Sequence, residues 1–232
     1  MKQNYLQCFP PAEEIDPDRT GEHRGKPLPE GSVAPPLRDD AFLLSGDEKV
    51  ELISGFFASI METLGLDLAD DSLRDTPRRV AQMYVNEIFR GLDPANKPRI
   101  ALFENRYRYA GMLIEKDIAV HSFCEHHFVP FVGKAHVAYI SCGKVIGLSK
   151  LNRIVKYFSQ RPQVQERLTV QIASELCRVL ETRHVAVVIE ARHHCISSRG
   201  VSDASSSTVT AHYSGDFSLD ATRNEFLRLI KL

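Results

Sequence analysis

Two short clusters of cysteine and histidine, far apart in the chain, place the strongest constraint on how this sequence can fold. Residues 124–127 read Cys-Glu-His-His, and residues 193–195 read His-His-Cys. Together they offer two thiolates and several imidazoles, which are the ligand types that bind zinc. Three protein ligands would leave one coordination position open, and an open position distinguishes a catalytic zinc from a structural one. We therefore expect a fold, or an assembly of subunits, that brings the two clusters to one ion.

The first cluster separates into ligands and a neighbouring acid-base group. The Cys-x-x-His spacing of Cys124 and His127 lets a turn place both side chains on one ion, which leaves His126 between them to face a substrate. A histidine beside a metal, but not bound to it, can transfer protons.

The second cluster follows an apolar run and is expected to be extended. Alternation along a strand would point His193 and Cys195 to one face and His194 to the other, so that Cys195 is a ligand with His193 beside the metal. The simpler alternative is that free cysteines are buried as small apolar residues, and we favour it for Cys142 and Cys177. We reject it for the cluster cysteines because histidines concentrate around them.

Composition fits a soluble intracellular enzyme. The chain has 232 residues and 43% hydrophobic content, which is enough for a buried core, and its formal net charge of -1 gives no general attraction to nucleic acid or anionic membranes. Its five cysteines are an odd number spread through the chain, so a disulfide framework is not expected. The N-terminus lacks the apolar core of a signal peptide, and no apolar run is long enough to span a membrane. We expect a cytoplasmic protein with no nucleic-acid or membrane partner.

The chain divides into an arm and a domain. Seven of the twelve prolines precede residue 41, which predicts a flexible arm over residues 1–44 and a domain over 45–232. Within the domain, residues 45–95 are predicted to be mainly helical. Ser45 and Glu48 have capping-box spacing ahead of one helix, and a second helix has Thr76 as its N-cap and Pro77 as its first residue.

Residues 96–232 mix strands and helices. Strands are predicted over 135–140, 185–189 and 207–213, and a final helix over 221–229. Ser149 is predicted to cap a short helix, and Pro162 to open a longer one. Two helices between pairs of strands, with more helix at each end, predict an α+β domain with an antiparallel sheet.

A cationic helix start suggests an anion site. Ser149, Lys150 and Arg153 lie where free N–H groups and the helix dipole favour a negative group, and Lys150 and Arg153 share a face. Folding or a neighbouring subunit could add Arg199 and Arg79. Taken alone, these residues fit a solvated basic face equally well.

Glu166 lies in the first turns of the longer predicted helix, beside Gln165. An acidic residue at a helix start suits the dipole and needs no function. A carboxylate near a zinc site can also accept two parallel hydrogen bonds, for example from N1–H and the 2-amino group of guanine. The residues permit both interpretations.

Several motifs in order resemble GTP cyclohydrolase I, and the similarity extends from about Gly46 to the C-terminus. They are Asp-Ser-Leu-Arg-Asp-Thr-Pro-Arg-Arg-Val from Asp71, Cys-Glu-His-His-Phe-Val from Cys124, Gly-Leu-Ser-Lys-Leu-Asn-Arg from Gly147, Gln-Arg-Pro-Gln-Val-Gln-Glu-Arg-Leu from Gln160, and His-His-Cys-Ile-Ser-Ser-Arg-Gly from His193. The resemblance does not extend to the arm before residue 45.

The resemblance implies a role for each site residue. Zinc would be held by Cys124, His127 and Cys195, while His126 and His193 would act as the acid-base pair. The substrate contacts implied are Glu166 with Gln165 at guanine, Ser149 at the ribose, and Lys150, Arg153, Arg199 and Arg79 at the triphosphate.

The implied fold is the tunnelling fold, an antiparallel sheet with helices packed on one face, preceded by N-terminal helices. The implied assembly is an allosteric, ring-shaped homodecamer with each active site at a junction of subunits. The implied reaction opens the imidazole ring of GTP, releases formate and forms 7,8-dihydroneopterin triphosphate, the first step toward tetrahydrofolate or tetrahydrobiopterin. The sequence does not identify a regulatory partner.

Four alternatives differ from this interpretation in ligands or in chemistry. A structural zinc protein would normally have a fourth protein ligand, and a zinc nucleoside deaminase would show His-x-Glu with Pro-Cys-x-x-Cys, which the chain lacks. A different tunnelling-fold enzyme, such as a deazaguanine nitrile reductase, would use a nucleophilic cysteine and a nicotinamide in place of zinc. A non-catalytic purine- or pterin-binding relative would be separated only by measuring turnover.

Overall fold

The computed structural model of the protein describes residues 37–231. Most of the predicted arm, residues 1–36, lies outside the described residues, and residues 37–44 form largely exposed turns. The division at residue 45 therefore stays a prediction. None of the helices between residues 37 and 231 is long and apolar enough to cross a membrane.

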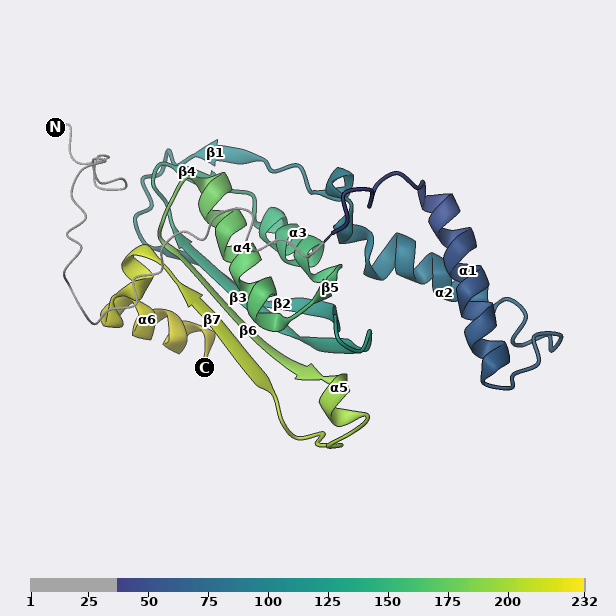
Figure 1. Ribbon diagram of the computed structural model, residues 1–232. Coiled ribbons are helices and arrows are strands. Elements are labelled where there is room, and N and C mark those ends of the chain that lie inside the picture. The colour runs from purple at the N-terminus through teal and green to yellow at the C-terminus, as the bar shows by residue number, and fades with distance from the viewer. Residues whose placement is uncertain (1–36, 232) are drawn as a thin grey trace.

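The N-terminal part is helical, as predicted. Helix α1 (Gly46–Thr63) begins with the expected capping box: Ser45 Oγ accepts from the Glu48 N–H, and the Glu48 carboxylate accepts from the Ser45 N–H at 2.8 Å. Helix α2 (Thr76–Met83) has Asp75 as its N-cap, so the prediction of Thr76 at this position is off by one residue. Figure 1 shows α1 and α2 side by side, beyond one end of the sheet.

Short helical turns connect these helices to the sheet. A π-helical turn η3 (Tyr84–Ile88) continues α2, and two 3-10 turns follow it, η4 (Arg90–Leu92) and η5 (Pro94–Asn96). The chain then enters the strands.

A five-stranded sheet in the order β5-β2-β3-β6-β7 forms the centre of the domain. Its strands are β2 (Met112–Cys124), β3 (Pro130–Ile140), β5 (Pro162–Gln163), β6 (Val185–His193) and β7 (Thr208–Tyr213). The long strands pair antiparallel, and only the short edge strand β5 runs parallel to its neighbour β2. A separate pair joins β1 (Leu102–Glu104) to β4 (Lys144–Ile146). The α+β class and the tunnelling-fold arrangement expected from the resemblance are confirmed.

Helices cover both faces of the sheet, but unequally. Helices α3 (Leu148–Ser159) and α4 (Gln165–Leu180) pack on one face, where the main core includes Leu151, Ile172 and Val187. The turn η6 (Gly215–Ser218) and helix α6 (Asp220–Ile230) place Phe217 and Phe226 against Val188 in a second core. Successive residues of a strand face opposite ways, so this second core lies on the opposite face. The expectation of helices on one face therefore holds for α3 and α4 and is wrong for α6. The continuously apolar β6 explains the difference, because a strand that is apolar on both faces needs cover on both.

Two predicted helix starts were wrong. Pro162 does not open α4; it pairs with Phe123 as part of β5, and α4 begins at Gln165. Proline is tolerated there because β5 is an edge strand, where no ladder hydrogen bond from its nitrogen is required. Ser149 does not cap α3 either, since Gly147 is the N-cap and no side chain caps the helix.

Gly133 lies in the central sheet where there is no room for a side chain. A Cβ atom at Gly133 would lie 2.0 Å from the Glu190 carbonyl oxygen and 2.5 Å from Ala191 Cα, both of which belong to the neighbouring strand β6. Gly133→Ala is expected to force β3 and β6 apart and to destabilise the protein by about 3 kcal/mol. A loss of this size lowers the Tm by roughly 6–12 °C in a domain of this size.

Gly55 provides the matched control for this measurement. It lies inside α1 with no atom within 4 Å of an added Cβ. Gly55→Ala is expected to stabilise the helix by about 0.5–1 kcal/mol. Equal Tm values for the two variants in thermal unfolding would contradict the packing argument.

Candidate metal centre and its surroundings

A closed turn at the end of β2 organises the first cluster. The Cys124 N–H donates to the Val129 carbonyl at 2.9 Å, and the Phe128 N–H donates to the Cys124 carbonyl at 2.8 Å. Phe128 has a φ of 53°, which reverses the chain into β3. The turn brings both histidines to the buried Cys124 sulfur: Nδ1 of His126 lies 3.6 Å and Nδ1 of His127 lies 3.9 Å from Cys124 Sγ.

The second cluster reaches the same place from β6. Strand β6 ends at His193, which is paired in register with Phe131 of β3, and the chain continues as the helical turn α5 (His194–Ser197). The predicted extended conformation through Cys195 is therefore wrong, and His194 is exposed on a helical turn. Even so, a ligand atom from each of Cys124, His127 and Cys195 lies within 4.8 Å of the other two.

The donor set fits a zinc ion. Zn–S distances of about 2.3 Å and Zn–N distances of about 2.0 Å place tetrahedral ligands some 3.5 Å apart, so the three side chains need to close by only about 1 Å. Burial raises the pKa of the Cys195 thiol, and the adjacent Cys124 sulfur raises it further. Two thiols in contact resist losing both protons, whereas a dication between them favours both thiolates. The structure thus supports a metal-binding group of Cys124, His127 and Cys195.

His193 is fixed beside this group by stacking and by one hydrogen bond. Its ring lies flat on Phe131, with centroids 4.6 Å apart and planes 10° apart, and its Nε2 lies 2.7 Å from Gln165 Oε1. Burial lowers the pKa of His193, and the nearby Glu166 carboxylate opposes this shift. The role of His193 beside a metal stays a prediction, and neither its stacking partner nor its hydrogen-bond partner could be identified from the sequence.

An ion pair links the first cluster to the start of α4. The Arg167 guanidinium donates to both carboxylate oxygens of Glu125, at 2.6 and 2.9 Å, and both side chains are partly buried. These hydrogen bonds lower the pKa of Glu125. A bidentate pair of this kind fixes direction as well as distance, so it holds the turn of residues 124–128 against the helix that carries Glu166. Sequence reasoning missed this pair, although the position of Glu125 within the metal cluster was a signal.

Arg167→Met is expected to destabilise the protein by about 1–2 kcal/mol at pH 7, because it leaves the Glu125 carboxylate without its partner. Since the pKa of Glu125 is lowered by folding, its contribution is complete above the unfolded pKa of about 4.3 and is lost as the pH falls through the folded pKa. The difference from wild type should therefore shrink on acidification. Urea denaturation at pH 7 and below pH 4 measures both effects.

Arg78→Met is the matched control. Arg78 makes a 2.5 Å ion pair with Glu51, but both side chains are more than half exposed. Such pairs contribute about 0.5 kcal/mol or less. Equal losses in the two variants would show that the Glu125–Arg167 pair is not a structural anchor.

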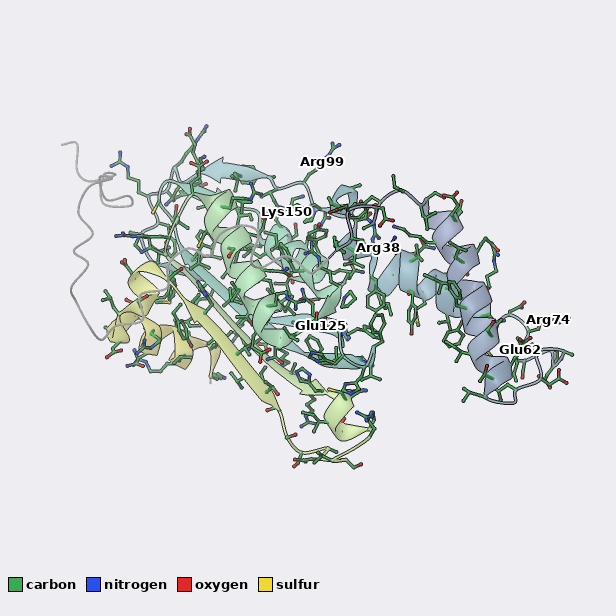
Figure 2. The ribbon with its side chains drawn as sticks, in the orientation of Figure 1. Arg38, Glu62, Arg74, Arg99, Glu125 and Lys150 are labelled. Carbon is green, nitrogen blue, oxygen red and sulfur yellow. The ribbon has the colours of Figure 1, made fainter. Side chains whose placement is uncertain are left out.

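The predicted substrate residues fall into two groups. Glu166 lies exposed in the first turn of α4. Arg199 follows α5, and its positive charge acts to lower the pKa of Cys195, but burial and the Cys124 sulfur outweigh it, so that the pKa is raised. By contrast, Ser149, Lys150 and Arg153 lie in the first turns of α3. The chain returns to the Cys124 end of β2 only after the end of α3, where β5 pairs with it. The twelve residues of α3 extend about 18 Å along the helix axis, which separates this group from the metal-binding group. Figure 2 shows Lys150 and Glu125 well apart.

Arg79, the remaining predicted phosphate contact, lies exposed on α2, and its guanidinium is 3.5 Å from the Asp75 carboxylate. The weak, exposed pair leaves the cation accessible. One chain therefore does not gather the four predicted phosphate contacts around the metal-binding group.

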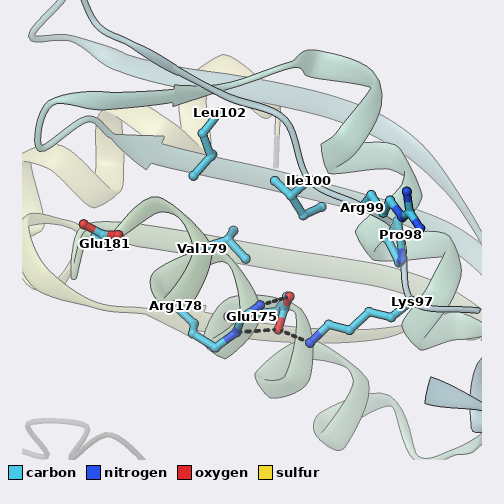
Figure 3. Close-up of a pocket in the computed structure, with 9 residues that line it drawn as sticks. All are labelled: Lys97, Pro98, Arg99, Ile100, Leu102, Glu175, Arg178, Val179 and Glu181. Carbon is cyan, nitrogen blue, oxygen red and sulfur yellow. Dashed lines mark hydrogen bonds and ion pairs between the residues drawn. The ribbon is translucent and has the colours of Figure 1, made fainter. Parts of the chain in front are cut away.

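A groove on the far side of α4 is unrelated to this centre. It encloses about 410 Å³ between residues 97–102 and the C-terminal half of α4 (Figure 3). Glu175 is buried there and is bound by Lys97 Nζ at 2.8 Å and by Arg178 at 2.7 and 3.1 Å. Burial acts to raise the pKa of Glu175, but the hydrogen bonds from Arg178 and Lys97 together keep it below its ordinary value. The groove thus holds a satisfied ion-pair network, and the metal-binding group remains the candidate site.

Comparison with known proteins matches the chain to one family over most of its length. The sequence model of the family described as GTP cyclohydrolase I matches residues 53–231. A protein from Flavobacterium johnsoniae named GTP cyclohydrolase 1 is 56% identical over 197 residues, covering 85% of this chain and 88% of the relative. Proteins of the same name from Aeromonas hydrophila and Escherichia coli are 54% and 52% identical, covering 81% and 84% of this chain and 87% and 89% of the relatives.

Proposed function

This chain belongs to the GTP cyclohydrolase I family, and from that premise we propose that it opens the imidazole ring of GTP at a zinc centre held by Cys124, His127 and Cys195. The products are formate and 7,8-dihydroneopterin triphosphate. The observation that carries the proposal is the convergence of these three side chains, from two distant segments, within 4.8 Å of one another. Cys124, His127 and Cys195 would hold the zinc ion, which would supply hydroxide at neutral pH as the nucleophile for C8 of the purine.

His193 is proposed to donate a proton to N7 of the purine, which makes C8 more electrophilic. Its ring is held rigidly between Phe131 and Gln165 beside the metal-binding group. General acid catalysis of this kind contributes about 10²–10⁴ in rate. His126, exposed on the turn of the first cluster, and Ser149 are proposed to serve the later proton transfers at the ribose.

The two ends of GTP are proposed to be held by opposite charges. Glu166 would accept hydrogen bonds from N1–H and the 2-amino group of guanine. Its position in the first turn of α4 leaves the carboxylate exposed to a ligand. Lys150, Arg153, Arg199 and Arg79 would bind the triphosphate. Holding both ends fixes C8 over the metal centre, so that binding energy from distant groups supports the reaction.

Incubating the zinc-loaded protein with GTP tests the proposal. Formate and a fluorescent oxidised pterin should both accumulate in proportion to the amount of protein. GTP binding with neither product would point to a non-catalytic purine- or pterin-binding relative. An absence of zinc from active protein would contradict the metal assignment.

The length of α3 supports a site shared between subunits. Within one chain the start of α3 lies away from the metal-binding group, so we propose that a neighbouring subunit of a homodecamer contributes Lys150 and Arg153. The interface would be head-to-tail, since different surfaces of the two subunits would meet in it.

Two inactive variants are then expected to complement each other. Cys195→Ser removes a metal ligand, and Lys150→Met removes a phosphate contact. In mixed oligomers, some junctions combine the intact metal-binding half of a Lys150→Met subunit with the intact phosphate-binding half of a Cys195→Ser subunit. Equal mixing should restore up to about a quarter of wild-type formate release, because each half of a shared site is intact half of the time.

A mixture of Cys195→Ser with Cys124→Ser is the control, since both changes damage the same half of the site. It should remain inactive. Failure of the first mixture, with hetero-oligomers verified by mass, would place the whole site within one chain.

A further inference from the structure

The side-chain amide of Gln165 has only one orientation compatible with its surroundings. Gln165 is 1% exposed, and its Nε2 donates to the backbone carbonyls of Ile189 at 3.0 Å and Thr208 at 2.9 Å. A carbonyl oxygen can only accept hydrogen bonds. Turning the amide over would place Gln165 Oε1 against both of these oxygens and bury unpaired acceptors, at a cost of about 1–3 kcal/mol for each.

A small hydrogen-bonded circuit reinforces this orientation. The Thr169 hydroxyl donates to the Gln165 backbone carbonyl at 2.9 Å and lies 2.7 Å from Thr210 Oγ1. Because the single proton of Thr169 is already used, Thr210 must donate to Thr169, which leaves Thr210 Oγ1 as an acceptor. Gln165 Nε2 lies 3.1 Å from that oxygen. Each hydroxyl direction is therefore consistent with Nε2 facing β6 and β7.

The fixed amide determines the protonation pattern of His193. Gln165 Oε1 faces His193 Nε2 at 2.7 Å, and because Oε1 has no proton to give, Nε2 must carry one. Stacking on Phe131, with ring planes only 10° apart, restricts the imidazole to this plane. Rotating the ring by 180° would replace the Nε2–H group with a C–H group and lose the hydrogen bond. Neutral His193 is thereby the Nε2–H tautomer, with Nδ1 unprotonated and not bonded to Gln165.

We propose that Gln165 is a positioning residue that holds His193 in the Nε2–H tautomer and presents Nδ1 alone to the substrate. This inference rests on the proposed function, in which His193 transfers a proton to the purine. It differs from the role that the family resemblance implies for Gln165, which is direct support of the guanine anchor. In the doubly protonated form Nδ1 also carries a proton, and this is the proton that His193 can donate to the purine, because Nε2–H stays bonded to the neutral Gln165 Oε1.

Nitrogen NMR of the zinc-loaded full-length protein, with isotope-labelled histidine, tests the tautomer without relying on turnover. The His193 signals are identified by their disappearance in His193→Asn. In wild type at a pH where His193 is neutral, Nε2 should show the shift of a protonated nitrogen and Nδ1 that of an unprotonated one. Gln165→Met should give an average of both tautomers, because the fixed acceptor is gone. An Nδ1–H tautomer in wild type would overturn the proposal even if Gln165→Met failed to fold.

Steady-state kinetics separate positioning from substrate binding. Gln165→Met is expected to lower kcat by about 10- to 100-fold, while the KM for GTP stays within about threefold of wild type. A raised KM with unchanged kcat would overturn the positioning role and leave the proposed function intact. If wild type released no formate, the proposed function would fail, while the NMR result on the free protein would still decide the tautomer.

Gln171→Met is the matched control. Gln171 is a second buried glutamine of α4, and its Oε1 accepts a 2.7 Å hydrogen bond from Gln163. It makes the same kind of buried contact away from His193, so a similar loss of stability is expected. The His193 tautomer and kcat should not change, and an equal fall in kcat in both variants would indicate a merely structural effect.

Discussion

Cys195→Ser is expected to remove both the bound zinc and the activity. The serine oxygen is a poor replacement for a thiolate, and among residues 37–231 three side chains converge on the proposed ion. Losing several kcal/mol of transition-state stabilisation corresponds to a fall of about 10³ or more in the rate of formate release. Metal analysis of the purified protein and a formate assay measure the two effects independently.

Cys177→Ser is the control for this experiment. Cys177 lies partly buried on α4, with its sulfur 4.0 Å from Ser214 Oγ, and does not belong to the metal-binding group. The zinc content per subunit should equal that of wild type, and the rate of formate release should change by no more than about twofold. Stoichiometric zinc in Cys195→Ser would remove Cys195 from the proposed ligand set.

His193→Ala is expected to separate chemistry from binding. The variant should retain zinc and bind GTP, while formate release falls by about 10²–10⁴, because the proposed proton donor to N7 of the purine is lost. Losing the stack on Phe131 should also cost about 1 kcal/mol of stability. Equilibrium binding of GTP, zinc content and single-turnover formate release together measure these effects.

Two variants bracket the result for His193. His194→Ala alters the next residue, which is exposed on α5, and should leave the rate near that of wild type. Glu166→Ala should instead weaken GTP binding, because the proposed guanine anchor is lost. A near-normal rate in His193→Ala would eliminate its role as the acid, and unchanged GTP affinity in Glu166→Ala would eliminate the guanine anchor.

Most of the secondary structure could be predicted because its signals are local. The capping box of Ser45 and Glu48 and the apolar run from Val185 depend on neighbours in sequence, and both predictions were confirmed. The helix start at Ser149 was wrong because Gly147 is the N-cap, whereas the one at Pro162 was wrong for a tertiary reason. Pro162 satisfies the rule for a first helical residue, yet pairing with β2 holds it in an extended conformation.

The prediction for Cys195 grouped it with Cys124 and His127, as the structure does, but from an incorrect conformation. Alternation along a strand placed Cys195 beside His193, whereas the strand ends at His193 and a helical turn carries Cys195 to Cys124. Cys195 still reaches Cys124 because side chains on a helical turn point back toward the residues that precede the turn. The ligand assignment itself stays a prediction until the metal is measured.

The sequence by itself determined the family, the enzyme class and the types of donor available, because these depend on which side chains are present and in what order. Only the tertiary structure decided how the donors are used. It brings Cys124, His127 and Cys195 together. It also pairs Glu125 with Arg167 and orients the Gln165 amide toward His193. It also separated the cationic start of α3 from the metal-binding group. These arrangements depend on strand register and on the direction of hydrogen-bond donors between distant segments, which local sequence patterns do not specify.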